Sequence, residues 1–197
     1  MIAHIQGKIV ELYATHIIID CNGIGYEVKI SLNTYSAIQK KESVRLVTHF
    51  HVKEDAQTLY GFYESTEKKR FLELLSINGV GPGTAIMILS SISPDELQSA
   101  IVSEDIKTIQ SVKGIGLKTA QRIVLELKDK MKKETLLDRS TSTKIREGNS
   151  LINEALSALM TLGIGKPAAE KNINLVIKEF GSSIPLEELI KLALKRA

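Results

Sequence analysis

The first third of the chain alternates between apolar and polar residues. The alternation is strict over Ile24-Gly25-Tyr26-Glu27-Val28-Lys29-Ile30, which is typical of a half-buried strand. Asn22-Gly23 predicts a tight hairpin just before it, and residues 32–38 predict one short helix. Five short strands with one crossing helix favour a small closed β-barrel of the OB type over residues 1–64. The other four predicted strands lie near residues 5–10, 17–19, 44–52 and 58–63.

From residue 65 the apolar residues recur at helical spacing instead. Residues 65–133 predict an all-α region, whose first helix can be capped by Ser65 or Thr66. Ser93-Pro94-Asp95-Glu96 predicts a further helix start, because it places a serine cap, a proline at the first position and a glutamate three residues on.

Beyond residue 133 the pattern changes twice. Residues 134–149 contain few apolar residues and no period, which is typical of a flexible linker. Residues 150–197 recover helical periodicity in three short segments, the second starting near Pro167 and the third near Pro185. We therefore expect a C-terminal three-helix bundle, and a fold class that is α+β with several domains.

A glycine-rich motif occurs twice within the helical region. Asn78-Gly79-Val80-Gly81-Pro82-Gly83-Thr84-Ala85 is echoed 35 residues later by Lys113-Gly114-Ile115-Gly116-Leu117-Lys118-Thr119-Ala120. Each copy follows an apolar run and precedes another, so each predicts a helix, a two-glycine hairpin and a second helix. Glycine allows positive φ and close approach of another chain, and the free N–H groups of the following helix form an anion site. The tandem copies are typical of DNA-binding proteins and predict that two adjacent phosphates are gripped.

Charge alone does not predict a nucleic-acid partner. The chain carries 26 Lys and Arg against 23 Asp and Glu, a formal net charge of +3. Residues 65–130 are almost neutral, with nine basic and eight acidic side chains. Any basic footprint must therefore come from the placement of charges rather than from their number.

Several other classes of function are disfavoured by the sequence. Cys21 is the only cysteine, so no disulfide framework or cysteine-rich metal site is expected. Gly163-Ile164-Gly165-Lys166-Pro167 is not a phosphate-binding loop, because proline follows the lysine. His49 and His51 share one side of a strand but have no third ligand nearby. We expect no ATP hydrolysis, no cofactor, no metal, no membrane span and a cytoplasmic location.

The most specific motifs resemble those of the RuvA family, the junction-binding subunits of bacterial Holliday junction branch-migration complexes. Besides the glycine motifs, they are Thr48-His49-Phe50, Glu54-Asp55-Ala56-Gln57 and Leu59-Tyr60-Gly61-Phe62. The match runs along nearly the whole chain and includes the UBA-like final helices. It implies a homotetramer, single or paired, that holds a four-way DNA junction open and planar during recombination and repair. It also implies that the bundle recruits the hexameric ATPase RuvB, with the RuvC resolvase as a further candidate partner.

The resemblance also assigns roles to individual residues. It implies that Glu54 and Asp55 form an acidic pin near the centre of the tetramer, where they repel DNA backbones. The implied DNA-binding residues are Asn78, Gly79, Gly81, Gly83, Gly114, Gly116, Lys118, Thr119 and Arg122. The implied apolar patch for the ATPase is Leu159, Leu162, Ile164 and Leu194, with Gly165 as an extra residue there.

Two positions depart from the family pattern. Gly83 and Leu117 each stand where a lysine is common, in the first and second hairpin respectively. The absence of these lysines should weaken phosphate contacts unless Lys113 or another lysine compensates.

Two alternative functions remain open at this point. Base-excision glycosylase/lyases share the pattern Gly-x-Gly-x-Lys-Thr-Ala, with the lysine as nucleophile, and Lys118 matches that position. Asp138 lies 20 residues on, near where such an enzyme keeps its carboxylate, but in the segment predicted to be mobile. The other alternative is a general duplex-binding accessory protein.

Overall fold

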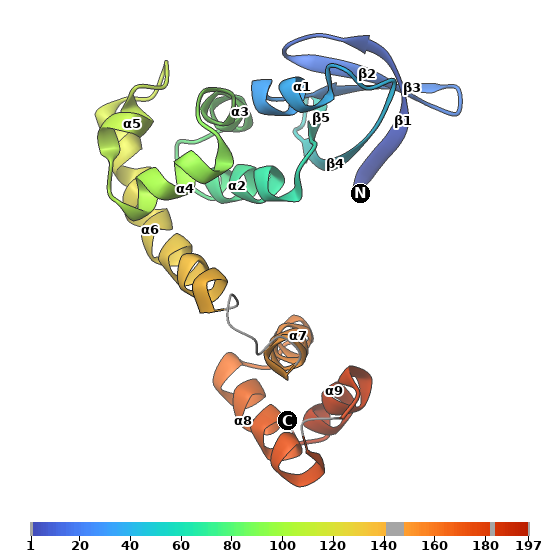
Figure 1. Cartoon of the computed structure of the whole chain (residues 1–197), viewed down its shortest axis with the longest axis vertical. Coiled ribbons are helices and arrows are strands. Elements are labelled where there is room, and N and C mark those ends of the chain that lie inside the picture. The colour runs from blue at the N-terminus through green and yellow to red at the C-terminus, as the bar shows by residue number, and fades with distance from the viewer. Residues whose placement is uncertain (1, 141–147, 182–183, 197) are drawn as a thin grey trace. The chain divides into compact units, whose positions relative to one another are not determined.

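The computed structural model describes residues 2–140, 148–181 and 184–196 (Figure 1). The chain divides into two compact units, Met1–Thr135 and Leu136–Ala197. Among the described residues, none of the helices combines the length and the apolar character that crossing a membrane requires.

The N-terminal part is a closed five-stranded barrel, as predicted, and its strands follow the order β1-β2-β3-β5-β4. All neighbouring strands are antiparallel except β3 and β5, which meet in a short parallel contact. Helix α1 (Leu32–Ile38) connects β3 to β4 and matches the predicted helix. The strands are β1 (His4–Leu12), β2 (His16–Cys21), β3 (Ile24–Lys29), β4 (Ser43–Val52) and β5 (Gln57–Phe62).

Two glycines in the barrel lie so close to a neighbouring strand that there is no room for a side chain. A Cβ atom added to Gly7 would lie 2.0 Å from the carbonyl oxygen of Asp20. At Gly61 it would lie 2.5 Å from Cγ1 of Val28. The predicted hairpin between β2 and β3 is also confirmed, because Asn22 and Gly23 both take positive φ, 56° and 91°, as a tight primed turn requires.

The helical part of this unit follows directly on β5. Its core includes Phe62 of β5 and Phe71 of the first helix, whose ring centroids are 4.9 Å apart. The predicted capping box at Ser93 and Glu96 is confirmed. The predicted cap at Ser65 or Thr66 is wrong, because Glu64 is the N-cap and makes no side-chain cap hydrogen bond. The helices are α2 (Ser65–Leu75), α3 (Pro82–Ser91), α4 (Pro94–Val102), α5 (Ile106–Gln110) and α6 (Leu117–Ser140).

Helix α1 fastens the barrel to the helical part. The buried carboxylate of Glu67 in α2 accepts hydrogen bonds from the hydroxyls of Ser31 and Thr34, the latter at 2.6 Å. The amide of Asn33 donates to the carbonyls of Leu89 and Ile92 at the end of α3. These carbonyls have no partner within their own helix, so a side chain from the barrel completes the end of α3.

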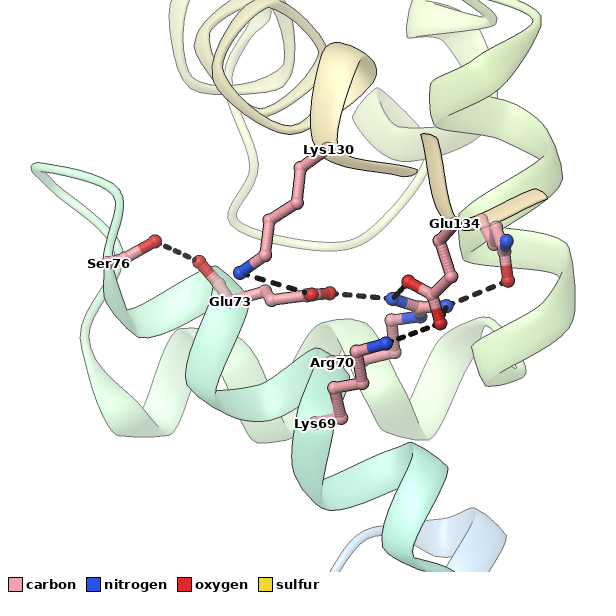
Figure 2. A network of polar contacts seen from close by, with 7 residues as sticks. Lys69, Arg70, Glu73, Ser76, Lys130 and Glu134 are labelled. Carbon is pink, nitrogen blue, oxygen red and sulfur yellow. Dashed lines mark hydrogen bonds and ion pairs between the residues drawn. The ribbon is translucent and has the colours of Figure 1, made fainter. Parts of the chain in front are cut away.

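A buried ion-pair network joins α2 to α6 (Figure 2). Arg70 is 4% exposed, and its Nη1 lies 2.7 Å from Oε2 of Glu73 and 3.0 Å from Oε2 of Glu134. Its Nη2 donates to Oε1 of Glu134 at 3.2 Å, so the guanidinium of Arg70 and the carboxylate of Glu134 form a bidentate ion pair. Lys69 also pairs with Glu134, and Lys130 lies 3.3 Å from Oε1 of Glu73.

The second unit contains the three predicted helices, α7 (Gly148–Thr161), α8 (Lys166–Phe180) and α9 (Leu186–Leu194). Its core is a small apolar cluster that includes Ala155, Leu159, Ile173 and Leu189. The expected linker spans residues 134–149, but the backbone stays helical through Ser140 as part of α6. Residues 141–147 of that expected linker lie outside the described residues.

Candidate nucleic-acid interface

Two hairpins with the same backbone hydrogen bonds lie in the first unit. Hairpin 1 (residues 76–81) connects α2 to α3, and hairpin 2 (residues 111–116) connects α5 to α6. In hairpin 1 the N–H of Val80 donates to the carbonyl of Ile77 at 3.0 Å, and in hairpin 2 Ile115 donates to Val112 at 3.0 Å. The 35-residue sequence repeat is therefore also a structural repeat.

The first helical turn after each hairpin is equivalent as well. The N–H of Ala85 donates to the carbonyl of Gly81 at 2.9 Å, and that of Ala120 donates to Gly116 at 3.0 Å. The N–H groups between these residues begin a helix and have no partner within it. They are those of Gly83 and Thr84 after hairpin 1, because Pro82 has no N–H, and those of residues 117–119 after hairpin 2. They carry the positive end of the helix dipole, so each hairpin presents backbone donors suited to a phosphate.

The glycines of the hairpins have two different roles. Gly79 and Gly114 take φ values of +93° and +85°, which disfavour any residue with a Cβ atom. Gly81, Gly83 and Gly116 do not take positive φ, and a Cβ added to any of them would meet nothing within 4 Å. These three glycines therefore leave open space at the helix starts, where another molecule can approach the backbone.

The apolar residues of the motif hold the hairpins in place. Val80 and Ile115 are 5% and 6% exposed, whereas the glycines beside them are exposed. The helix residues Thr84 and Thr119 are half-buried at equivalent positions. Buried side chains thus anchor each turn to the core, while the backbone of the turn is exposed to solvent.

Cations surround the two hairpins unequally. Lys113 and Lys118 are exposed residues of the second motif. Arg122, on the next turn of α6, donates from Nη1 to the carbonyl of Asn78 in hairpin 1 at 3.1 Å. The structure therefore brings Arg122 to the first hairpin, a contact that the sequence pattern did not predict.

The acidic pair lies on the loop between β4 and β5. This loop is closed by a hydrogen bond from the N–H of Lys53 to the carbonyl of Ala56 at 2.8 Å. Glu54 and Asp55 are both exposed. Within the part of the chain that the structure describes, neither carboxylate makes a hydrogen bond or an ion pair. The loop thus presents two uncompensated negative charges.

The apolar patch predicted on the bundle needs one correction. Leu159 is 0% exposed, because it lies one helical turn after Ala155 on the face of α7 that packs into the core. Leu162 and Leu194 are 60% and 38% exposed, and Ile164 is half-buried. Leu159 therefore supports the patch from inside and does not belong to its surface.

A shallow hollow of about 520 Å³ lies beside Leu162. Helices α7 and α9 form it, and Leu186 on α9 is a lining residue that the sequence pattern did not single out. Leu186 was missed because it reads as one more apolar position of a short helix. The lining residues are Glu154, Ser157, Ala158, Thr161, Leu162 and Leu186.

His49 and His51 belong to an aromatic contact between barrel and helices. The ring of His49 lies 5.5 Å from that of Phe71 and 6.0 Å from that of His51, centroid to centroid. Burial lowers the pKa of His49, and the nearby His51 and Lys68 lower it further. Among the described residues no group of three or more His, Cys, Asp or Glu side chains is arranged to hold a metal ion.

Comparison with protein families divides the chain into three matched segments. Residues 1–61 match the RuvA N terminal domain, residues 71–129 match the SAM-like helix-hairpin-helix tandem, and residues 150–197 match the RuvA C-terminal domain.

Similar curated proteins cover the whole chain. A protein of Cytophaga hutchinsonii is 54% identical over 197 residues, which cover 99% of each chain. Proteins of Christiangramia forsetii and Bacteroides fragilis are 48% and 45% identical, and the matches cover 100% of each chain. All three are named Holliday junction branch migration complex subunit RuvA. With this identity over its full length and with both RuvA domain models matched, the chain belongs to the RuvA family.

Proposed function

We propose that this chain is the non-catalytic DNA-binding subunit of a branch-migration complex and that it holds four-way DNA junctions. The observation that carries the proposal is the repeated hairpin, in which two exposed helix starts share the same backbone hydrogen bonds. Two equivalent anion sites on one unit suit the repeating phosphates of a DNA backbone. The names of the similar proteins support a junction as the preferred DNA.

Recognition through phosphates has a definite consequence for specificity. Phosphate contacts fix the position of a protein on DNA but carry no sequence information. Selectivity must then come from the shape of the DNA, so a junction and a linear duplex of the same sequence are distinguished by geometry. Affinity should also fall steeply with added salt, because each neutralised phosphate releases counterions.

The acidic loop supplies the discrimination against linear duplex. In a homotetramer, single or paired, four copies of Glu54 and Asp55 would lie near the centre of a flat DNA-binding face. Carboxylates repel phosphates, so a continuous duplex running across that centre would be disfavoured. Four duplex arms that leave the centre free would be accepted, which keeps the crossover open and planar.

The C-terminal bundle is the docking element for the RuvB ATPase motor. Leu162 and Leu194 are exposed there and Ile164 is half-buried, and the hollow beside Leu162 suits an apolar side chain of a partner. The division of labour is then a barrel with the acidic loop (1–64), a DNA-gripping region (65–133), a connecting segment (134–149) and a motor-binding bundle (150–197).

The lyase alternative is not favoured. Lys118 belongs to the compact unit Met1–Thr135, whereas Asp138 lies beyond it, in the segment expected to be a linker. A nucleophile and its supporting carboxylate must lie within hydrogen-bond reach of one substrate. A general duplex-binding accessory differs from a junction protein in that it would bind linear duplex as tightly as a junction.

The test is a binding competition between a four-way junction and a linear duplex of the same sequence. Fluorescence anisotropy over a series of salt concentrations should show tighter binding of the junction, independent of its sequence. Lys118→Gln should weaken that binding, whereas Lys40→Gln, which removes an exposed charge from the barrel, should not. Equal affinity for duplex and junction would contradict the proposal.

The role of the bundle is tested separately with a chain that ends at Asp138. This chain retains the compact unit that spans Met1–Thr135, so junction binding should be preserved. Stimulation of the RuvB ATPase and branch migration should be abolished. Full branch migration by the shortened chain would remove the role given to Leu162 and Leu194.

A further inference from the structure

The two helix-hairpin-helix repeats contact each other through equivalent positions. Met87 in α3 and Arg122 in α6 are 35 residues apart, and each lies five residues after the first residue of its helix. Arg122 donates a hydrogen bond to the carbonyl of Asn78 in hairpin 1 at 3.1 Å. Met87 lies beside hairpin 2, because a Cβ atom added to Gly114 would lie 3.9 Å from its Sδ atom. Each helix therefore reaches across to the hairpin of the other repeat.

Met87 brings a different chemistry to this equivalent position. Its thioether carries no charge and donates no hydrogen bond, so it leaves the backbone donors of hairpin 2 free for a phosphate. The residue is nevertheless 42% exposed, so small solutes in water can reach its side chain. Its sulfur lies against Gly114, whose positive φ of +85° belongs to the turn that presents those donors. A chemical change at this sulfur would therefore occur beside an anion site.

We propose that Met87 is a site of reversible oxidation, and that its sulfoxide weakens the binding of DNA by hairpin 2. The proposal rests on the proposed function, because it takes hairpin 2 to be a phosphate site. Hydrogen peroxide is the oxidant: its O–O bond breaks, one oxygen is transferred to Sδ, the sulfur gives up two electrons, and water is released. Methionine sulfoxide reductases reverse the change, with two thiols that become a disulfide while the oxygen leaves as water.

Oxidation changes the property of Met87 that matters to a phosphate. It converts a flexible apolar side chain into a polar one, whose oxygen carries a partial negative charge and accepts hydrogen bonds. An oxygen beside Gly114 would repel an approaching phosphate and compete with it for the backbone donors of hairpin 2. Hairpin 1 keeps its own donors, so the affinity for DNA should fall without being abolished.

Two other methionines provide internal controls. Met160 on α7 is 47% exposed but belongs to the second compact unit, and Met131 on α6 is 0% exposed. Because oxidation depends on exposure, peroxide should oxidise Met87 and Met160 faster than Met131. Of the two exposed residues, only Met87 lies beside a hairpin, so only its oxidation should change the binding of DNA.

The experiment treats the full-length chain with hydrogen peroxide, locates the oxidised residues by peptide mass spectrometry and measures junction affinity by fluorescence anisotropy. The oxidised parent should bind about fivefold more weakly, which is the effect of losing one ordinary hydrogen bond. Reductases for both sulfoxide epimers should restore the original mass and the original affinity. Met87→Leu, a replacement of similar volume without an oxidisable atom, should bind as the untreated parent does and keep that affinity after peroxide. Unchanged thermal unfolding midpoints verify that each protein remains folded.

Met160→Leu is the matched control and should lose affinity after peroxide as the parent does. Both variants retain Met1 and Cys21, so oxidation at those two residues would affect them equally. Equal losses by the parent and by Met87→Leu would overturn the proposal. So would unchanged affinity of a parent oxidised at Met87, or no oxidation of Met87 under conditions that oxidise Met160. Failure of the untreated parent to prefer the junction would instead contradict the proposed function itself.

Discussion

Acidic residues occupy two contrasting kinds of site in the first unit. Glu67 and Glu73 on helix α2 are each 3% exposed and lie among hydroxyl groups, an arginine and a lysine. Glu54 and Asp55 on the β4–β5 loop are exposed and have no hydrogen-bond or ion-pair partner among the described residues. Burial with partners identifies the first pair as structural, since an unpaired buried carboxylate would be strongly destabilising.

The exposed pair contributes nothing comparable to the fold. Like charges on adjacent residues repel, and no cation from the described part of the chain offsets them. We therefore expect their effect to fall on a molecule that approaches from outside. The contrast yields three predictions about the free energy of unfolding, given in order of decreasing expected effect.

The largest effect is expected from Arg70→Met. This change leaves Glu73 and Glu134 without the guanidinium that lies between them (Figure 2). Breaking a buried ion pair from one side destabilises by about 3–5 kcal/mol, which urea denaturation would measure directly. Lys69→Met is the neighbouring control, because its pair with Glu134 is half exposed and should contribute at most about 1 kcal/mol.

Replacing both members of the pair sharpens this test. Arg70→Met/Glu73→Met removes the two charges together, and an apolar pair of similar volume often restores much of the stability. A double variant that is no more stable than Arg70→Met alone would mean that the arginine acts mainly through Glu134 and Gln98. The ion pair between Arg70 and Glu73 would then not be a structural contact of the kind contrasted with the exposed loop.

A smaller, pH-dependent effect is expected from Glu67→Gln. Burial raises the pKa of the Glu67 carboxyl, and the hydrogen bonds from Ser31 and Thr34 only partly oppose it. Between the ordinary pKa and the raised one, the folded chain holds a proton that the unfolded chain has released. The parent should therefore lose stability as the pH rises through that window.

The variant cannot titrate at position 67, so its stability should lack this decline. Denaturation curves at a series of pH values give the free energy of unfolding of parent and variant. The parent should be more stable relative to the variant at low pH, and this difference should disappear as the pH rises. Glu42→Gln, which removes an exposed carboxylate from the same compact unit, controls for the removal of one negative charge. A difference between parent and variant that is constant with pH would contradict the role of burial.

The smallest effect on stability is expected from Glu54→Gln/Asp55→Asn. An exposed site without partners should change the free energy of unfolding by no more than about 0.5 kcal/mol. Binding should nevertheless change: linear duplex should bind more tightly, and the preference for the junction should shrink. Glu11→Gln/Glu42→Gln removes two other exposed carboxylates of the barrel and should alter neither. Duplex and junction affinities that both match the parent's would leave the loop as a solvated turn.

Much of the fold was predictable because local patterns and the final structure agree. Alternation over residues 24–30 indicated a strand, Asn22-Gly23 a tight turn, and Ser93 with Glu96 a capping box. The repeat of glycines at a fixed offset predicted the two hairpins, because positive φ at Gly79 and Gly114 is a local requirement.

What the sequence did not reveal depends on contacts between distant residues. Leu159 and Leu162 look alike in a helical pattern, yet one is fully buried and the other is exposed, because packing against α8 and α9 decides. The resemblance implied that Arg122 binds DNA, but its hydrogen bond to Asn78 depends on how α6 packs beside hairpin 1 and could not be predicted. The network around Arg70 likewise joins residues far apart in the sequence.

Helix α1 has a consequence for how the chain folds. It belongs to the barrel by sequence, yet Asn33 completes the end of α3, and Ser31 and Thr34 satisfy the buried carboxylate of Glu67. Neither the barrel nor the helical region can therefore satisfy its own polar groups when cut from the other. The segments that match separate sequence families lie in one compact unit as far as Thr135, and we expect the two to gain or lose their structure together.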